Sequence, residues 1–253
     1  MAAALRNEYA EIETATRVRE FFFETLVSLD DVQYQESAMF HVDPQFFDIF
    51  TVEPVSGDME TALTDPYTVV ITQSMARKYF GESPALGRIL RFDNSRDYEI
   101  TGVIADFPAN SHFHPEFLVS FTSNGNHDSQ FWVNNNIQTY LLLNENASAA
   151  ALEPKLQDLV TKYVAPQIEE GIGASYEDFL AGGGRYVYGL FPVKDIHLHS
   201  TVDGDIEPPG SAVYVYTFQA VALFILLLVL PAAKLCRFQK GIHRIIQAMP
   251  TAL

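Results

Sequence analysis

The stretch YTVVITQSMARKYFG (67–81) contains the clearest structural unit of the chain. Its first five residues are rich in β-branched side chains, which predicts a strand over 67–71. Thr72 follows at a good N-cap position for a helix, and Gly81 stands at the C′ position where helices commonly end. A strand that leads directly into a capped helix indicates a fold that mixes both kinds of element.

The segments around this unit predict further strands and helices. RILRF (88–92) and YEITGVIADF (98–107) flank the turn signal DNSR (93–96), which indicates a hairpin. We expect further strands after residue 11, over 32–42, at 117–121 and 137–144, and at the end of 181–199. We expect helices over 43–50, with Asp43 as N-cap and Pro44 in the first turn, at 57–63, and over 147–170, with Pro154 early in the helix or at a kink. This mixture, without a regular βαβ repeat, predicts an α+β fold.

Charge is distributed very unevenly along the 253 residues. All 32 acidic residues lie at or before Glu207, together with 12 of the 16 lysines and arginines, which gives this part a net charge of −20. The remainder contains Lys234, Arg237, Lys240 and Arg244 and no acidic residue, so its charge is +4. We expect the two parts to face different surroundings. The acidic part disfavours nucleic-acid binding, because that binding depends largely on neutralising phosphates.

An uninterrupted apolar run separates the two parts, with no charged side chain between Glu207 and Lys234. A helix over 211–233, N-capped by Ser211, would be about 34 Å long, enough to cross the hydrocarbon core of a bilayer. Nearby tyrosines stand at one end, where aromatic rings favour the membrane interface. We therefore predict a transmembrane helix over 208–233. A buried core helix is the alternative, and it would leave the basic flank unexplained.

The basic residues after the apolar run place its C-terminal side in the cytoplasm. Residues 1–207 then lie outside the cytoplasm, and 234–253 form a basic cytoplasmic tail. The opening sequence MAAALRNEYAEIE lacks the apolar region of a signal peptide. We therefore expect an upstream transmembrane helix that this sequence does not contain.

Motifs that carry chemistry are sparse. AGGGR (181–185) has neither the spacing nor the Lys-Ser/Thr of a nucleotide-binding loop, and the sequence contains no G-x-S-x-G nucleophile motif. Because Cys236 is the single cysteine, an intramolecular disulfide is excluded. Cysteine content therefore does not indicate whether the protein lies in a reducing or an oxidising compartment. We expect no catalytic residue, no cofactor and no enzymatic activity in this chain; an anchored hydrolase would need a nucleophile and base that the sequence does not show.

Two H-x-H pairs, His112/His114 and His197/His199, are weak candidates for metal ligands. If each pair lies on a strand, its imidazoles point to the same side, and four imidazoles on facing strands could bind Zn²⁺. A large apolar residue separates the two histidines of each pair, however, which is the pattern of an ordinary half-buried strand. We therefore predict no metal site.

Residues 69–121 resemble the MacB-like periplasmic core domain of FtsX-type ABC transporter permeases. In that family a strand leads into a helix ending in Phe-Gly, followed by Pro-x-x-Gly and by a hairpin with Thr-Gly-Val. The matching residues are Phe80, Gly81, Pro84, Gly87, Thr101, Gly102 and Val103. VDPQFFDIF (42–50) and DIHLHS (195–200) are also similar to the family, and the likeness covers most of 7–228. We interpret the matching glycines as fold-determining, because glycine tolerates positive φ, bulges and close backbone approach.

The resemblance implies a two-lobed periplasmic domain, one lobe mixed α/β and one smaller and β-rich, over residues 1–207. It implies a permease of the bacterial inner membrane that pairs with a second permease copy or paralogue and binds a separate cytoplasmic ABC ATPase. ATP hydrolysis by that subunit would move the periplasmic domains, which act on a periplasmic partner protein or lipoprotein in export or extraction of a substrate. The alternative is a membrane-tethered extracytoplasmic sensor or binding module without transport activity.

The C-terminal part departs from the family. After LFILLL (223–228) the family continues with a different basic segment and two more membrane helices, and VLPAAKLCRFQKGIHRIIQAMPTAL (229–253) keeps only the positive charge. We therefore expect a fragment, a truncated product or a frame-shifted product.

Overall fold

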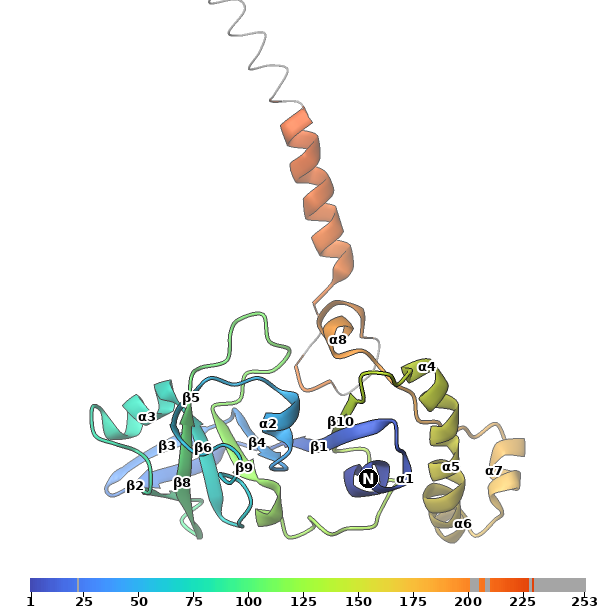
Figure 1. Ribbon diagram of the computed structural model, residues 1–253, viewed down its shortest axis with the longest axis horizontal. Coiled ribbons are helices and arrows are strands. Elements are labelled where there is room, and N and C mark those ends of the chain that lie inside the picture. Colours follow the sequence, from blue (N-terminus) through green and yellow to red (C-terminus); the bar gives the residue numbers. More distant parts are fainter. Residues whose placement is uncertain (22, 201–204, 208–209, 228, 230–253) are drawn as a thin grey trace, which may run out of the picture. The chain divides into compact units, whose positions relative to one another are not determined.

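The computed structural model describes residues 1–21, 23–200, 205–207, 210–227 and 229. The chain divides into two compact units, Met1–Phe191 and Pro192–Leu253. The first unit contains a ten-stranded sheet (Figure 1). Its strands are β1 Ile12–Glu20, β2 Thr25–Leu29, β3 Val32–Glu36, β4 Met39–Val42, β5 Pro54–Gly57, β6 Thr68–Thr72, β7 Ile89–Phe92, β8 Arg96–Ile104, β9 Phe117–Ser120 and β10 Gln138–Leu143.

The sheet is mixed. Its order is β10-β1-β4-β9-β6-β8-β7-β2-β3, and β5 pairs with β8 beside this path. β4 pairs with β9 and β6 with β8 in parallel, whereas the other pairs are antiparallel. All five residues of the central strand β6 are buried, as expected for a strand covered on both faces.

Helices cover the two ends of this sheet in the first unit (Figure 1). They are α1 Ala2–Glu8, α2 Phe46–Ile49, α3 Gln73–Phe80, α4 Ala149–Leu152, α5 Gln157–Leu159, α6 Ala165–Ile172 and α7 Tyr176–Ala181, with 3₁₀ turns at Phe121–Ser123 and Glu153–Leu156 and a π-helical turn at Val160–Val164. The second unit contains α8, Val193–His199, and a helix over 212–227.

The strand and helix predicted at 67–81 are confirmed as β6 and α3. The Thr72 hydroxyl accepts a hydrogen bond from the Met75 backbone N–H at 3.4 Å, which caps the helix. Gly81 follows the helix with φ 61°, a conformation that costs glycine little. β7 and β8 form the predicted hairpin, and Asp93 and Asn94 at its turn have φ 50° and 52°, as a type I′ turn requires.

Two hydrophobic clusters lie against different parts of the sheet. The first packs α3 on strands β2, β4, β6, β7, β8 and β9, with Met75, Phe92 and Phe117 among its buried members. The second packs α1 and the helical segment 149–172 on β1, with Leu5 and Leu159 among its buried members. The described residues thus form two cores that share one large mixed sheet, and the second core is built from helices packed on β1 instead of the smaller β-rich lobe that the resemblance implies.

Four sequence predictions about local structure need correction. Residues 32–42 form two strands, β3 and β4. A turn at residues 37–38 interrupts the extended conformation, and there the Met39 N–H donates to the Ser37 carbonyl. The helix predicted over 43–50 begins only at Phe46, and Asp43 does not cap it. Of the helix predicted over 57–63, Gly57 ends β5 and residues 58–63 form hydrogen-bonded turns.

The predicted last strand is instead the helix α8. His197 and His199 therefore lie in the last turn of a helix and not on a strand. The long helix predicted over 147–170 is present as a continuous helical series. Pro154 lies in its 3₁₀ turn and Pro166 follows its π turn. Proline has no backbone N–H to donate, so the regular hydrogen-bond pattern is interrupted near these residues.

The helix over 212–227 begins directly after Ser211, whose carbonyl accepts from the Val215 N–H at 3.3 Å. Its large hydrophobic side chains are exposed, Phe218 by 73%. Within the part of the chain that the structure describes, no helix meets the length and hydropathy needed to cross a bilayer. The predicted span over 208–233 includes residues 208–209, 228 and 230–233, and the predicted tail over 234–253 follows them; all of these lie outside the described residues.

Candidate functional site

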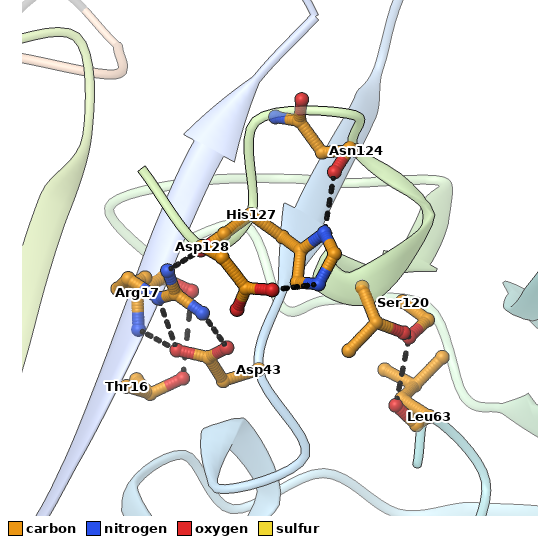
Figure 2. A network of polar contacts seen from close by, with 9 residues as sticks. Thr16, Arg17, Asp43, Leu63, Ser120, Asn124, His127 and Asp128 are labelled. Carbon is orange, nitrogen blue, oxygen red and sulfur yellow. Dashed lines mark hydrogen bonds and ion pairs between the residues drawn. The ribbon is translucent and has the colours of Figure 1, made fainter. Parts of the chain in front are cut away.

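A polar cluster lies where β1, the neighbour of the edge strand β10, meets the end of β4. Its centre is Arg17 on β1, whose guanidinium meets the Asp43 carboxylate in two hydrogen bonds, Nε to Oδ2 at 2.9 Å and Nη2 to Oδ1 at 2.8 Å (Figure 2). The Arg17 backbone N–H also donates to Oδ2 at 2.9 Å. The two side chains are only 21% and 11% exposed. This geometry is the bidentate arrangement that makes an arginine–carboxylate pair strong.

The same arginine holds the loop that follows β9. Its Nη1 donates to the His127 carbonyl at 2.7 Å, and its guanidinium carbon lies 3.8 Å from the centre of the Phe121 ring. The His127 ring in turn contacts the Asn124 carbonyl through Nδ1 at 3.0 Å and the Asp128 carboxylate through Nε2 at 2.9 Å (Figure 2). One side chain thus joins β1, the end of β4 and the loop over 121–137.

A second histidine lies beside this cluster. His41 on β4 pairs with Arg19 on β1 and stacks on Phe21 with ring centres 4.2 Å apart. Burial and then the positive charge of Arg19 lower the pKa of His41 to about 4, because both disfavour the charged imidazolium. His41 is therefore neutral at neutral pH.

A cavity of about 210 Å³ opens next to this cluster, within the first unit. Arg17 and Arg19 of β1 form part of its wall, and Thr139 of β10 contributes another part. The rest comes largely from the loop over 121–137, including Asn124 and Trp132. The side chains that form it are mostly polar, and Met1, Phe131 and Ile137 contribute apolar surface.

The loop that closes this cavity is held from behind by the helical segment. The Trp132 backbone N–H donates to Gln167 Oε1 at 2.7 Å, and Gln167 Nε2 donates to the Gln130 carbonyl at 2.6 Å. The Trp132 ring stacks on Tyr163 with centres 4.2 Å apart and planes 3° apart. The indole is therefore fixed in place and anchors the loop.

A separate ion pair fastens α3 to the edge of the sheet. The buried carboxylate of Glu36 on β3 accepts from Lys78 Nζ at 2.7 and 2.8 Å and from the Tyr79 hydroxyl. Burial, followed by the bond to Glu36, raises the pKa of Tyr79 strongly. The nearby Glu116 has a raised pKa, mainly through burial and then through the charge of Glu36. Glu36, Lys78 and Tyr79 are all paired with one another, so we interpret this group as a structural tie.

The fold-determining residues named from the family motif extend from the last residue of α3 into β8. Gly87 has φ 76° and its N–H donates to the Ile100 carbonyl at 2.7 Å, at the entry to the hairpin. A Cβ on Gly102 would lie 2.5 Å from Met59 Cε and 3.1 Å from Val70 Cγ2. The pairing of β6 with β8 shifts register at this point, so Gly102 follows a bulge.

The other motif residues have packing roles. Val103 is buried in the first cluster, and Phe80 packs against that cluster with Arg88 over its ring. The Thr101 hydroxyl donates to the Ala62 carbonyl. Pro84 is exposed in the turn after α3.

Neither histidine pair lies on a strand. The arrangement considered for zinc, with four imidazoles on facing strands, is therefore not formed by these residues. His112 and His114 lie in the loop between β8 and β9, where His112 contacts the Tyr140 hydroxyl at 3.1 Å and His114 the Pro108 carbonyl at 3.2 Å. Among the described residues, no three His, Cys, Asp or Glu side chains are placed to hold a metal ion.

The residues of the cavity were not singled out in the sequence. Arg17 and Arg19 stand in an ordinary alternating strand, and the asparagines stand more than 100 positions later. The signals that could have found them are two arginines on one face of a strand inside an acidic region, and the polar run around the single Trp132.

Comparison with known proteins identifies the class. Residues 1–159 match the family described as the MacB-like periplasmic core domain. A domain of a protein described as a permease, from Porphyromonas gingivalis, is similar in structure, with a TM-score of 0.57 and 28% sequence identity over 64% of this chain and 69% of that one.

Two other solved structures have lower scores. The periplasmic region of MacB from Actinobacillus actinomycetemcomitans gives a TM-score of 0.47 at 14% identity, covering 72% of this chain and 79% of that one. The extracellular domain of the ABC-type transporter YknZ from Gram-positive bacteria gives 0.41 at 13% identity, covering 67% and 81%. Comparison with curated protein sequences gives no significant match.

The family match over residues 1–159 defines a periplasmic domain of the ABC transporter permease class. The chain belongs to the MacB-like periplasmic core domain family, as its sequence motifs predict.

Proposed function

We propose that this chain is the periplasmic part of a permease subunit in which ATP hydrolysis by a partner subunit drives a conformational change outside the cytoplasm. That movement would act in export or extraction of a substrate. The observation that carries the proposal is the apolar helix over 212–227, which follows a domain of this family and exposes hydrophobic side chains all round, among them Tyr214, Phe218 and Phe224. A helix that is apolar on every side requires lipid or other apolar helices around it.

The charges on either side support the same arrangement. The acidic part before residue 208 and the four basic residues after residue 233 follow the positive-inside rule if the apolar run crosses the inner membrane with its C-terminal side in the cytoplasm. Residues 1–207 would then lie in the periplasm.

The sheet supports mechanical coupling within the first unit. Its strands connect the second hydrophobic cluster to the first through continuous pairing from β10 to β3. Because hydrogen-bonded sheets and packed cores resist deformation, a displacement applied at one end reaches the other. We propose that the chain has no catalytic activity of its own, and that a separate cytoplasmic ABC ATPase and a second permease copy or paralogue are its partners.

Affinity purification in detergent from the source cells tests the proposal. The chain, tagged at its natural locus, should remain in carbonate-washed membranes and copurify with a subunit that contains G-x-x-x-x-G-K-[ST]. An alkaline phosphatase fusion after residue 200 should be active, since that enzyme folds only outside the cytoplasm. Recovery in the soluble fraction would overturn the membrane assignment. Membrane recovery with no ATPase would instead favour a tethered sensor or binding module, a candidate that the cavity beside Arg19 supports.

A further inference from the structure

The loop over 121–137 contains a dipeptide that occurs once in the chain, Asn124-Gly125. The side-chain amide of an asparagine can react with the backbone nitrogen of the next residue, because the attack closes a five-membered ring within one molecule. A following glycine favours this ring closure, since it has no Cβ to crowd the nitrogen and adopts a wide range of backbone conformations. Whether the two groups react depends on their surroundings in the folded chain.

The attacking group, the backbone nitrogen of Gly125, is open to solvent. Gly125 is exposed, and a Cβ placed on it would have nothing within 4 Å. Within the part of the chain that the structure describes, its N–H donates no hydrogen bond. The nitrogen can therefore attack without first breaking a hydrogen bond of its own.

The group under attack, the side-chain amide of Asn124, is already polarised. Its Oδ1 accepts a hydrogen bond from the Asn126 backbone N–H at 3.1 Å, which forms an Asx-turn. When the Gly125 nitrogen adds to the Asn124 Cγ, negative charge develops on this same oxygen. A backbone N–H that is aimed at an oxygen where charge develops lowers the barrier, as in an oxyanion hole.

A second asparagine in the same loop provides an internal comparison. The Asn134 Oδ1 accepts from the Asn136 backbone N–H at 3.2 Å, in the same type of turn. The residue after Asn134 is Asn135, however, which carries a Cβ and a branched side chain. Asn134 therefore has the polarised amide without the following glycine.

We propose that Asn124 is a site of spontaneous covalent modification, at which the chain rearranges its own loop. The Gly125 nitrogen bonds to the Asn124 Cγ, its proton passes to the side-chain nitrogen, and that nitrogen leaves as ammonia. The product is a cyclic succinimide, which one water molecule then opens. Addition of water at Cγ yields aspartate at position 124. Addition at the main-chain carbonyl carbon yields isoaspartate, in which the main chain runs through Cγ.

The isoaspartate product changes what the loop contacts. The Asn124 carbonyl accepts from the His127 N–H at 2.9 Å and contacts His127 Nδ1 at 3.0 Å. In isoaspartate this carbonyl becomes part of a free carboxylate, and the main chain gains one methylene group. The turn over 124–127, which presents the His127 carbonyl to Arg17 Nη1 at 2.7 Å, is then broken. This chemistry concerns the loop alone and does not rest on coupling to an ATPase.

Peptide mass spectrometry of the full chain in detergent tests the chemistry. The chain is aged at constant pH and temperature and digested at intervals, and the conversion of each asparagine from amide to acid is followed. Asn124 should convert about tenfold faster than Asn134, which corresponds to a barrier difference of about 1.4 kcal/mol. Its rate in the folded chain should equal or exceed its rate in urea, because the Asn126 donor is held in place only by the fold.

One variant removes the reaction and keeps the fold. Gly125→Ala places a Cβ in open space, so the chain should fold normally, while conversion of Asn124 should slow about tenfold and that of Asn134 should not change. Asn124→Asp supplies the aspartate product without the additional methylene group and should unfold at the same urea concentration as the fresh chain. Aged chain enriched in isoaspartate should unfold at a lower urea concentration.

Any of three results would overturn the proposed site. They are equal conversion of Asn124 and Asn134, a rate at Asn124 in the folded chain well below the rate in urea, and an unchanged rate at Asn124 in Gly125→Ala. An isoaspartate-enriched chain that unfolds at the urea concentration of the fresh chain would overturn the proposed rearrangement of the loop.

Discussion

Removing the Asp43 carboxylate should destabilise the first unit more than removing any single exposed acid. Asp43→Ala deletes three charge-assisted hydrogen bonds from Arg17, two of them from its guanidinium, and leaves that guanidinium beside Phe121 without its counter-ion. Breaking a buried ion pair by removing one partner costs about 3–5 kcal/mol. Because Arg17 keeps 21% exposure and its bond to the His127 carbonyl, we expect the lower end of this range.

A double-mutant cycle isolates the interaction itself. Arg17→Met removes the charge and keeps much of the apolar stem over Phe121, so Arg17→Met/Asp43→Ala should be more stable than the sum of the single losses predicts. We expect a coupling free energy of about 2 kcal/mol, in the range measured for residues within one network. The matched control is the exposed pair Arg91–Asp97, 3.8 Å apart, for which we expect less than about 0.5 kcal/mol.

Urea unfolding of the full chain in detergent, followed by the fluorescence of Trp132, measures both quantities. Trp132 is 6% exposed and stacked on Tyr163, so unfolding of the second hydrophobic cluster changes its signal. A loss in Asp43→Ala no larger than that in Asp97→Ala would refute the reasoning. A coupling free energy near zero would show that Arg17 and Asp43 contribute independently.

Two further substitutions test other parts of the fold by the same unfolding assay. Gly57→Ala should lower the free energy of unfolding by more than about 2 kcal/mol, because Gly57 has φ 89° and a Cβ there would lie 2.8 Å from Gly102 Cα. Gly125→Ala is the control and should be near neutral, because the space around Gly125 is open. Equal losses of stability in the two variants would contradict this account. Stability should fall by up to about 3 kcal/mol as pH is lowered from about 6.5 to 4, because the unfolded chain binds a proton on His41 that the folded chain, with a pKa of about 4, resists. Glu116 has a raised pKa, which acts in the opposite sense, and it is still present in His41→Phe. That variant should therefore lose only the contribution of His41 to the dependence of stability on pH. An unchanged dependence of stability on pH would contradict the prediction.

Local signals in the sequence predict the elements that depend on neighbouring residues. Thr72 and Gly81 mark both ends of α3 because capping and positive φ are properties of single positions. The same holds for the hairpin turn at Asp93 and Asn94. These elements, and the family motif built on them, could be found without a structure.

The sequence does not show features that depend on pairing across the sheet. Asp43 reads as an N-cap for the following helix, but β1 places Arg17 beside it, and an ion pair with three hydrogen bonds competes successfully for its carboxylate. The cavity likewise depends on the pairing of β1 with β10, which no local pattern encodes. VKDIHLH fits a strand or a short helix equally well, and the chain adopts α8 directly after Pro192.

Both ends of the first unit lie in the same cluster: Leu5 of α1 and Leu190, near the boundary with the second unit, line one small cavity together with Leu159. A domain that is entered and left at adjacent points can be inserted between two neighbouring helices with little spacing between its anchors. The sheet extends from there over eight strand spacings, about 38 Å. If the sheet moves as a rigid body, a tilt of about 10° at its β10 edge displaces β3 by about 7 Å.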